Sequence, residues 1–278
     1  AVPTIDADLI ATLFRERGFS ATSFNNYLTS PWLYVARNVL RIPEVQSLPL
    51  LYGTAIHDVL ERLSKTYTAE RTLPPLSTAE GWLRTALARL PLTDSEYSQL
   101  HERALQAMTL YHEHLVATLP ARTREEVKLS VVLESGEQGC PDIVLTGKLD
   151  RLDIAEDGTV LRVVDYKTGK AKTRNAIEGK TKTDDGGYKR QLVFYALLLE
   201  LHDEAALKTR TMTLSFVEPT TKGEIREETF TITDEEIDEL KQRITAAAQE
   251  LTTGAWQQTP CDADVLEYCD ILQPKTAA

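Results

Sequence analysis

Apolar residues recur with helical spacing over roughly the first 120 positions. In residues 6–17, for example, Leu9, Leu13 and Phe14 fall on one face, as in an amphipathic helix that packs on a core. Proline residues interrupt the pattern, and the stretch 72–77 is the expected loop. The predicted helices are 6–17, a helix that begins after Ser20 or Thr22, 32–40, 53–67, 78–90 and 96–119.

The pattern changes at about residue 125, where apolar residues begin to alternate with polar ones. Val127, Leu129 and Val131 share one face of a predicted strand, and a second strand follows over 143–149. Residues 160–166 are apolar on both faces, which is typical of a central strand. The remaining predicted elements are a turn at 156–158, a helix over 188–201, strands over 211–217 and 229–232, and a helix over 233–251. This order predicts an α/β fold, with one mixed sheet flanked by helices and a helical N-terminal region.

The composition is that of an ordinary folded domain. Of 278 residues, 42% are hydrophobic and 26% are charged, which supports a sizeable core and excludes wholesale disorder. The longest apolar run, 192–199, is much shorter than the roughly 20 residues of a membrane-spanning helix, so we expect no membrane partner. The three cysteines include no C-x-x-C pair and cannot form a disulfide framework, and no signal peptide opens the chain, so we expect a reducing cytoplasm. Because position 1 is Ala and not Met, we expect a processed chain or part of a longer one.

The charge is distributed unevenly along the chain. The net charge of −11 at first disfavours a nucleic-acid partner, since phosphate binding depends on Lys and Arg. Residues 161–190, which we call the basic strip, nevertheless carry nine basic and four acidic side chains, so that +5 lies in the strip and −16 on the rest. Such a strip could guide a polyanion to one place on an acidic body. A solvated charged loop explains the same composition equally well.

The end of the strand 160–166 carries groups that are suited to hydrolysis. Asp165 and Lys167 are two residues apart and therefore share a face, and the short hairpin brings Asp150 close to them. Two neighbouring carboxylates repel each other unless a cation or a proton lies between them. Mg²⁺ suits such a place because it takes oxygen ligands and keeps positions for water and phosphate oxygens. The pattern predicts metal-assisted hydrolysis of a phosphodiester, in which Lys167 holds the attacking water or stabilises the added charge.

Spacing alone leaves a second interpretation of these residues open. Asp165 with Lys167, and Asp153 with Arg151, can form a purely structural network of ion pairs. Structural networks collect charged residues as active sites do, so the charges by themselves do not separate the two interpretations.

Three further polar residues are ambiguous by themselves. His57 lies on a predicted helix, where a single His is most often a partly exposed side chain. Gln191 and Tyr195 share one face of the helix 188–201, and their polar ends could orient a phosphate or Lys167. A Tyr packed in the core and a Gln near a helix start would explain the same two residues.

Four motifs, in order along the chain, connect these residues. They are Gly53-Thr54-Ala55-Ile56-His57, the G-x-[IL]-D-R-x-D pattern at 147–153, Asp165-Tyr166-Lys167-Thr168-Gly169 and Gln191-x-x-x-Tyr195. Together they resemble the PD-(D/E)XK nuclease superfamily, in particular the branch of the nuclease domains of RecB and AddAB and of the C-terminal domains of some UvrD-type helicases. The segments 20–24 and 27–32 are similar to that branch as well, so the likeness covers most of the chain.

The resemblance implies a restriction-endonuclease-like mixed central sheet and a set of site residues. It implies a helical region 1–124 that carries the histidine motif within the same nuclease domain, a nuclease core 125–255, and a tail 256–278 that packs back on the N-terminal helices. The implied catalytic residues are Asp150, Asp165, Lys167, Gln191 and Tyr195. The implied ligands of Mg²⁺ or Mn²⁺ are His57, Asp150, Asp165 and the backbone carbonyl of Tyr166. The expected DNA contacts are Arg151, Thr168, Lys170, Lys172, Arg174, Lys189 and Arg190.

In one respect the sequence departs from that branch. Many members hold a [4Fe–4S] cluster on one Cys of the N-terminal motif and three near the C-terminus. Ser30 stands at the N-terminal place, the tail keeps only Cys261 and Cys269, and the third cysteine, Cys140, lies in the hairpin region. Because such a cluster needs four thiolates, we predict no iron–sulfur cluster.

The resemblance implies a Mg²⁺- or Mn²⁺-dependent deoxyribonuclease that acts on single-stranded DNA or DNA ends in the manner of an exonuclease. The chain has no G-x-x-x-x-G-K-[ST] loop, so any unwinding must come from a helicase domain of the same or another chain. The setting that we expect is DNA repair and recombination in the bacterial cytoplasm. Two alternatives stay open: a catalytically silent nuclease-like domain that binds DNA or a partner protein, and an acidic scaffold whose motifs are only ion pairs.

Overall fold

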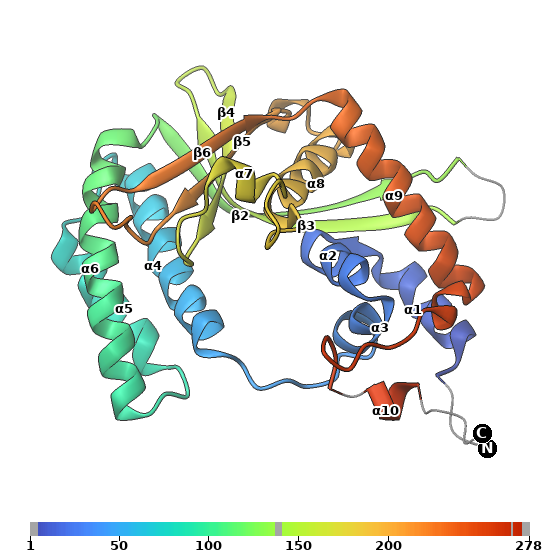
Figure 1. The fold of residues 1–278 in the computed structure, drawn as a ribbon. Helices are drawn as coiled ribbons and strands as arrows, with labels where there is room; N and C mark the ends of the chain where they lie inside the picture. Colours follow the sequence, from blue (N-terminus) through green and yellow to red (C-terminus); the bar gives the residue numbers. More distant parts are fainter. Residues whose placement is uncertain (1–4, 137–140, 268, 274–278) are drawn as a thin grey trace.

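One mixed sheet runs across the molecule (Figure 1). The structure, a computed structural model, describes residues 5–136, 141–267 and 269–273. The six strands of this described part are β1 (Phe19–Ser20), β2 (Arg122–Leu133), β3 (Ile143–Ile154), β4 (Val160–Lys167), β5 (Thr211–Phe216) and β6 (Arg226–Thr231). Their order is β1-β3-β4-β5-β6, with β2 paired to β3 as well. β4 pairs antiparallel with β3 and parallel with β5, which makes it the central strand that its apolar pattern predicted.

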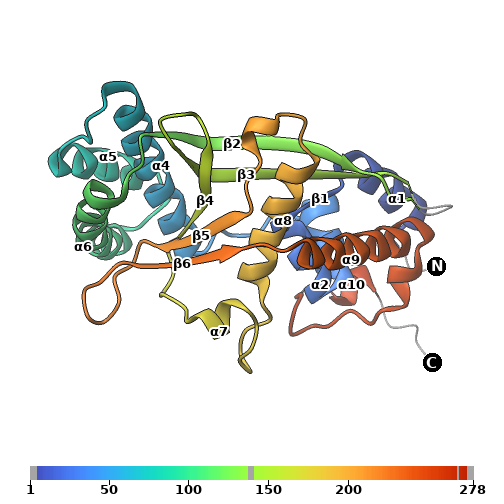
Figure 2. The same cartoon turned by 90° about the horizontal axis from the view of Figure 1, so that it is seen from above.

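The helices gather at the two ends of this sheet and over its centre. The first group is α1 (Ala7–Arg17), α2 (Ala21–Thr29) and α3 (Pro31–Tyr34), which continues as a π-helical turn η1 (Val35–Val39), and the second is α4 (Leu48–Glu70), α5 (Leu76–Ala88) and α6 (Asp94–Thr118). The later helical elements are α7 (Arg174–Ile177), α8 (Gly187–Leu201), η2 (Ala205–Leu207), α9 (Asp234–Thr253), η3 (Ala255–Gln258) and α10 (Cys269–Leu272). Figures 1 and 2 show α4, α5 and α6 at one end of the sheet, α1, α2, α3 and α9 at the other, and α8 between them. The predicted fold class is confirmed.

Two hydrophobic cores lie on the two faces of β4, because its side chains alternate. Val163 is buried with α8 and the N-terminal helices α1 to α3. Val164 and Tyr166 are buried in a second core with α4, α5 and α6. Both faces of β4 are therefore covered, and a polar residue on this strand is held in place by packing on each side.

Short elements account for most of the differences from the predicted secondary structure. β1 has two residues and α7 has four, which is too short for any hydrophobic period to be visible. Helix α4 begins at Leu48 and not at residue 53, because Pro49 is tolerated in a first helical turn. Residues 40–47 cross between the two helical groups without forming a helix or strand (Figure 1). The predicted division at 124/125 and 255/256 stays a prediction, although β1 carries part of the N-terminal region into the sheet.

The C-terminal segment lies against the N-terminal helices. The rings of Trp256 and Trp32 meet edge to face with centroids 4.8 Å apart. The indole N–H of Trp32 donates a hydrogen bond of 2.7 Å to the carbonyl of Thr259. The expected packing of the whole tail 256–278 stays a prediction, because part of it lies outside the described residues.

A disulfide joins Cys261 to Cys269, whose Cα atoms are 5.4 Å apart. The cysteine spacing did not lead us to expect this bond, because two cysteines eight residues apart show no recognisable pairing pattern in sequence. Cys140 lies outside the described residues, and the absence of an iron–sulfur cluster stays a prediction. No helix in the described part of the chain has the length and the apolar character that a membrane span requires.

Gly18 offers a test of how closely α1 packs on the sheet. Its φ of +57° is unfavourable for other residues, and a Cβ there would lie 1.7 Å from the carbonyl oxygen of Val144 on β3. Gly18→Ala should therefore lower the free energy of unfolding by at least about 2 kcal/mol in urea denaturation. The matched control is Gly81→Ala within α5, where a Cβ meets nothing within 4 Å. The free energy of unfolding of that variant should rise by up to about 1 kcal/mol. Equal effects of the two substitutions would contradict the close packing of Gly18 on β3.

Candidate active site

Strand β4 presents Asp165 and Lys167 to helix α8. Both follow Val163 in steps of two, so they point to the face on which α8 packs, as the period predicted. The Asp165 side chain is buried, and its Oδ2 lies 2.8 Å from Nζ of Lys167. This pair is close, yet Oδ2 takes no well-directed hydrogen bond. A buried carboxylate oxygen that lacks a hydrogen-bond donor can accept a further cation as a ligand.

Helix α8 holds the other Asp165 oxygen and the lysine. Gln191 Nε2 donates to Asp165 Oδ1 at 3.0 Å, and the Tyr195 hydroxyl donates to the same oxygen at 3.1 Å. Lys167 Nζ donates to Gln191 Oε1 at 2.6 Å. The predicted sharing of one helix face by Gln191 and Tyr195 is confirmed, and Nε2 of Gln191 also donates to the Tyr195 hydroxyl at 2.7 Å. The amide of Gln191 thus connects the acid and the ammonium group.

Gly147 lets α8 approach the sheet closely enough for these bonds. A Cβ at this position would lie 2.4 Å from Cδ1 of Leu198 and 3.9 Å from the ring of Tyr195. A side chain on Gly147 would overlap the buried Leu198 side chain of α8, which would have to move. The glycine of the motif at 147–153 therefore has a packing role.

Asp150 reaches the same place from β3. Its Oδ2 accepts a hydrogen bond of 2.9 Å from the backbone N–H of Tyr166, the residue after Asp165, and the Asp150 charge acts on Asp165. The N–H and C=O of one strand residue point to the same edge, which places the Tyr166 carbonyl on the side of Asp150. The next carbonyl, that of Lys167, accepts from Val217 toward β5, consistent with this alternation.

His57 approaches from helix α4 on the far side of β4. Its Nδ1 lies 3.5 Å from Oδ1 of Asp150. Gly53, one turn earlier, allows α4 to lie against the end of β4, since a Cβ there would be 3.1 Å from Oγ1 of Thr168. Contacts connect Asp165, Lys167, Gln191 and Tyr195 at one end of β4, and a separate contact connects His57 with Asp150. Among the described residues, Asp165 does not share with His57 and Asp150 a set of ligand atoms that lie within 4.8 Å of one another.

The charges at this point perturb each other. Burial raises the pKa of Asp165, the Lys167 ammonium group opposes that rise, and the nearby Asp150 carboxylate adds to it. Burial tends to lower the pKa of His57, but the nearby Asp150 carboxylate outweighs burial and raises it. Burial also raises the pKa of Tyr195, so its hydroxyl stays protonated and able to donate. The site concentrates negative charge that one cation would relieve.

The donor groups suit a divalent metal ion. Two carboxylates and a backbone carbonyl supply the oxygen ligands that Mg²⁺ and Mn²⁺ prefer, and His57 adds a nitrogen. Ligand atoms of His57, Asp150 and a third residue, Glu126, lie within 4.8 Å of one another. Glu126 was missed from sequence because it lies outside the four motifs, and only the pairing of β2 with β3 brings it to the level of Asp150.

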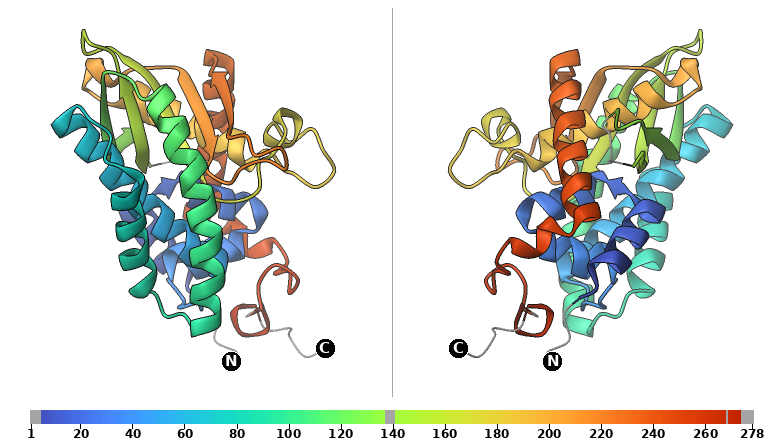
Figure 3. Two further views of the ribbon diagram at one scale, coloured as in Figure 1. Left: turned by 90° about the vertical axis from the view of Figure 1, so that its left-hand side faces the viewer. Right: turned by 90° about the vertical axis from the view of Figure 1, so that its right-hand side faces the viewer.

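Most cations of the basic strip are already paired. The ion pairs that engage its proposed DNA-contacting members are Lys172 with Asp184, Arg174 with Glu178 and Glu228, Lys189 with Glu236, and Arg190 with Asp185. For the exposed Lys170, no ion pair is found among the described residues. Figure 3 shows that the segment with α7 projects from the body of the protein. The strip is therefore more nearly neutral than its composition indicated.

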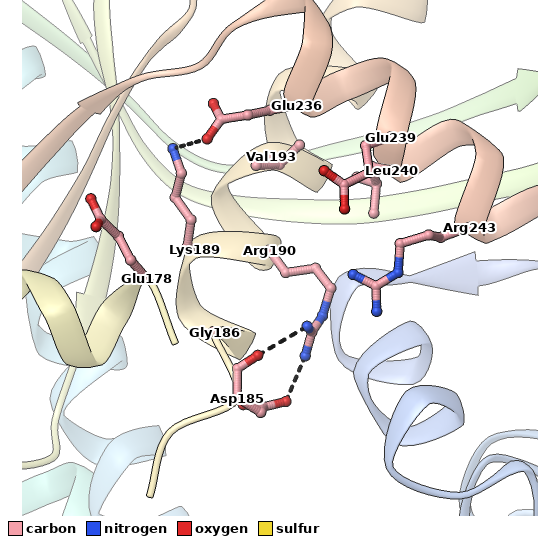
Figure 4. Close-up of a pocket in the computed structure, with 10 residues that line it drawn as sticks. All are labelled: Glu178, Asp185, Gly186, Lys189, Arg190, Val193, Glu236, Glu239, Leu240 and Arg243. Atoms are coloured by element: carbon pink, nitrogen blue, oxygen red, sulfur yellow. Dashed lines mark hydrogen bonds and ion pairs between the residues drawn. The ribbon is translucent and has the colours of Figure 1, made fainter. Parts of the chain in front are cut away.

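A pocket of about 240 Å³ illustrates this neutralisation (Figure 4). It lies between α8 and α9, and Lys189 and Arg190 meet Glu236 and Asp185 across it. Lys189 and Arg190 are thus paired with carboxylates in this structure, and none of the catalytic candidates lines the pocket.

The structure corrects the prediction that Arg151 contacts DNA. It is only 1% exposed, so it cannot touch DNA on the surface. Its guanidinium group donates to both oxygens of Asp153, at 2.6 and 3.2 Å, and to the Tyr166 hydroxyl at 2.9 Å. Asp153 also accepts from Arg162 at 2.7 Å. The structure therefore contains the Arg151–Asp153 ion pair that the second interpretation proposed. It lies on the face of β4 that carries Tyr166, whereas Asp165 and Lys167 lie on the opposite face.

Comparison with known proteins agrees with this architecture. The fold and site define an α/β domain of nuclease type, and the family model of the PD-(D/E)XK nuclease superfamily matches residues 18–272. The chain therefore belongs to the PD-(D/E)XK nuclease superfamily, and the predicted resemblance is confirmed. A protein of Eubacterium rectale with a predicted exonuclease function has a similar structure, with a TM-score of 0.54 and 13% identity over 95% of this chain and 90% of that one. At this identity the likeness shows the fold alone.

Curated relatives are much longer proteins. The B component of an ATP-dependent helicase/deoxyribonuclease from Acetivibrio thermocellus is 27% identical over 228 residues, which is 71% of this chain and 18% of the relative. The protein of the same name from Streptococcus suis is 24% identical over 73% of this chain and 20% of its own length. The chain thus spans about a fifth of the length of these relatives.

The network behind the site gives a prediction about pH. Burial raises the pKa of Glu227, but His114 and Arg162 outweigh burial and lower it to about 2. Because the folded pKa lies below the unfolded one, the stabilisation is complete above about pH 5 and disappears as the pH falls toward 2. Glu227→Gln should cost on the order of 2–3 kcal/mol of unfolding free energy at pH 7 and much less near pH 2.5. Urea denaturation at several pH values measures this, and a difference independent of pH would contradict it.

Proposed function

We propose that this chain is a divalent-metal-dependent deoxyribonuclease that hydrolyses phosphodiester bonds of single-stranded DNA or DNA ends. The observation that supports it most is the convergence of two carboxylates, a lysine and a histidine at the end of β4. A purely structural domain has no need to bury Asp165 beside Asp150, since the two charges repel each other. Membership of a nuclease superfamily supports the same reaction.

Metal binding is the first part of this proposal. Asp150, Asp165, His57 and the Tyr166 carbonyl would hold Mg²⁺ or Mn²⁺. When bound, such an ion would neutralise charge on the scissile phosphate and lower the pKa of a bound water. Asp150 is fixed for this role by the Tyr166 N–H, and Asp165 by Gln191 and Tyr195.

Lys167 is the proposed catalytic cation. Its ammonium group would hold the attacking water or stabilise the charge that accumulates on the phosphate in the transition state. The 2.6 Å bond to Gln191 and the Tyr188 ring, 4.5 Å from Nζ, restrict its position. Gln191 would therefore act by orienting Lys167, and Tyr195 by orienting Asp165.

Two open grooves beside the site offer a path for a strand of DNA. One, of about 460 Å³, is lined by α4 residues including His57, and by Thr168 at the end of β4. The other, of about 350 Å³, includes Gln191, Lys172 and the half-buried ring of Tyr188. An aromatic ring beside a basic group, such as Tyr188 with Lys172, is typical of surfaces that hold single strands. Carboxylates also line both grooves, so a bound divalent ion would supply part of the attraction for phosphate. We propose Thr168, Lys170, Lys172, Arg174, Lys189 and Arg190 as the DNA contacts.

A helicase partner is part of the same proposal. The curated relatives are described as subunits of a helicase/deoxyribonuclease, so a helicase domain of the same or another chain would supply the DNA end. We propose that the activity belongs to DNA repair or recombination in the bacterial cytoplasm and that digestion starts from ends.

Asp165→Asn tests the reaction. The substitution keeps the size of the side chain but removes a metal-binding charge, so Mn²⁺-dependent digestion of linear single-stranded DNA should fall roughly a thousandfold or more. The matched control is Asp203→Asn, an exposed carboxylate in the turn after α8, which should digest like the unaltered protein. Covalently closed single-stranded circles, which have no ends, should resist digestion by the unaltered protein and by the control variant. Absence of digestion by the unaltered chain would favour the catalytically silent alternative.

Lys167→Met separates metal binding from turnover. Met has an unbranched side chain of similar length but lacks the ammonium group that lies over the Tyr188 ring. We expect Mn²⁺ to bind at least as tightly, because a neighbouring positive charge is lost, while turnover falls by roughly a hundredfold or more. Calorimetric titration with Mn²⁺ and a single-turnover digestion measure the two quantities. Undiminished turnover would exclude Lys167 from catalysis.

A further inference from the structure

We propose that Glu126 is an additional metal ligand, which acts with His57 and Asp150, and that Lys148 competes with the metal ion for it. This inference rests on the proposed function, since it concerns the same site. Glu126 lies on β2, outside every motif that led to the other ligands.

Pairing between strands puts Glu126 at the site. In the register of β2 and β3, Glu125 pairs with Arg151 and Val127 with Leu149, which puts Glu126 at the level of Asp150. Glu126 itself is not paired in the ladder, and its φ of +53° departs from the extended conformation. One ligand atom from each of His57, Glu126 and Asp150 can be chosen so that all lie within 4.8 Å of one another. Two ligands of one ion are at most twice the coordination distance apart, about 4.2 Å for Mg²⁺ and about 5 Å for Ca²⁺. The three groups therefore need only a small contraction to hold one ion.

The state of the Asp150 carboxylate points to a ligand in this direction. Asp150 is only 9% exposed, and its Oδ2 accepts the Tyr166 N–H. Its Oδ1 has His57 Nδ1 at 3.5 Å, which is longer than a hydrogen bond. An oxygen of a nearly buried carboxylate with such a distant partner has room to accept a cation or a water. His57 and Glu126 both line the groove on that side.

Lys148 gives Glu126 a counter-ion that can leave. The two form an ion pair in which the lysine side chain is 50% exposed and the glutamate 19%. A half-exposed ammonium group loses little when it moves into water, whereas Glu126 cannot move as far from the site. The ion pair and the metal therefore compete for the same carboxylate, and Lys148 should weaken metal binding.

The test is calorimetric titration of the full chain with Mn²⁺ alone. Glu126→Gln removes the charge, and Glu126→Asp keeps the charge but withdraws the carboxylate by one methylene group. Both should raise the Kd for Mn²⁺ by about tenfold or more, whereas Lys148→Gln should lower it. The matched control is Glu61→Asp, because Glu61 lines the same groove and pairs with a lysine, Lys65, outside the ligand group. Its Kd should change less than about twofold, since surface charges act weakly.

Each outcome decides the proposal. Weakening by Glu126→Asp with no effect of Glu61→Asp supports direct ligation, because general electrostatics would leave both unchanged. An unaltered Kd in Glu126→Asp overturns the inference but leaves the proposed function standing. Failure of the unaltered chain to bind Mn²⁺ overturns both. Thermal unfolding without Mn²⁺ shows that each variant folds, and if Glu126→Gln does not, the charge-preserving Glu126→Asp decides.

Discussion

Burial of the Asp165 carboxylate at the end of β4 determines how the other site residues are arranged. Packing on both faces of β4 removes this carboxylate from water, which disfavours its ionised form, and the neighbouring Asp150 charge disfavours that form further. Gln191, Tyr195 and Lys167 each offset part of this free-energy cost. Packing of α8 on the sheet brings in Gln191 and Tyr195, whereas Lys167 lies two residues after Asp165 on β4 itself. The groups that stabilise the acid are therefore the groups that would position it for chemistry.

The fold and the main site could be predicted because their signals are local. The change from helical to alternating apolar spacing near residue 125 separates helices from sheet, and a period of two puts Asp165 and Lys167 on one face. A spacing of four likewise puts Gln191 and Tyr195 together on α8. His57 is different: periodicity left it ambiguous, and only its motif connected it with Asp150, which lies 93 positions later in the chain.

What could not be predicted depends on pairing between distant segments. Glu126 becomes a neighbour of Asp150 through the register of β2 and β3, which no local pattern specifies. The positive charge of Arg151 suggested a DNA contact, yet hydrogen bonds to Asp153 and Tyr166 hold this residue in the core. Acidic partners from β6 and α9 neutralise much of the basic strip. The net charge of −11 is thus less informative than the position of each carboxylate, since a bound divalent ion would convert the acids at β4 from repelling phosphate to holding it.

Everything proposed for this protein requires that the buried acids at the end of β4 hold a divalent cation. Anomalous X-ray scattering from crystals of the chain soaked in Mn²⁺ measures this without reference to activity. We expect a peak within about 2.2 Å of oxygens of both Asp150 and Asp165, on the side of His57. A peak bound elsewhere, or none at a Mn²⁺ concentration that saturates the protein in solution, would contradict the proposal.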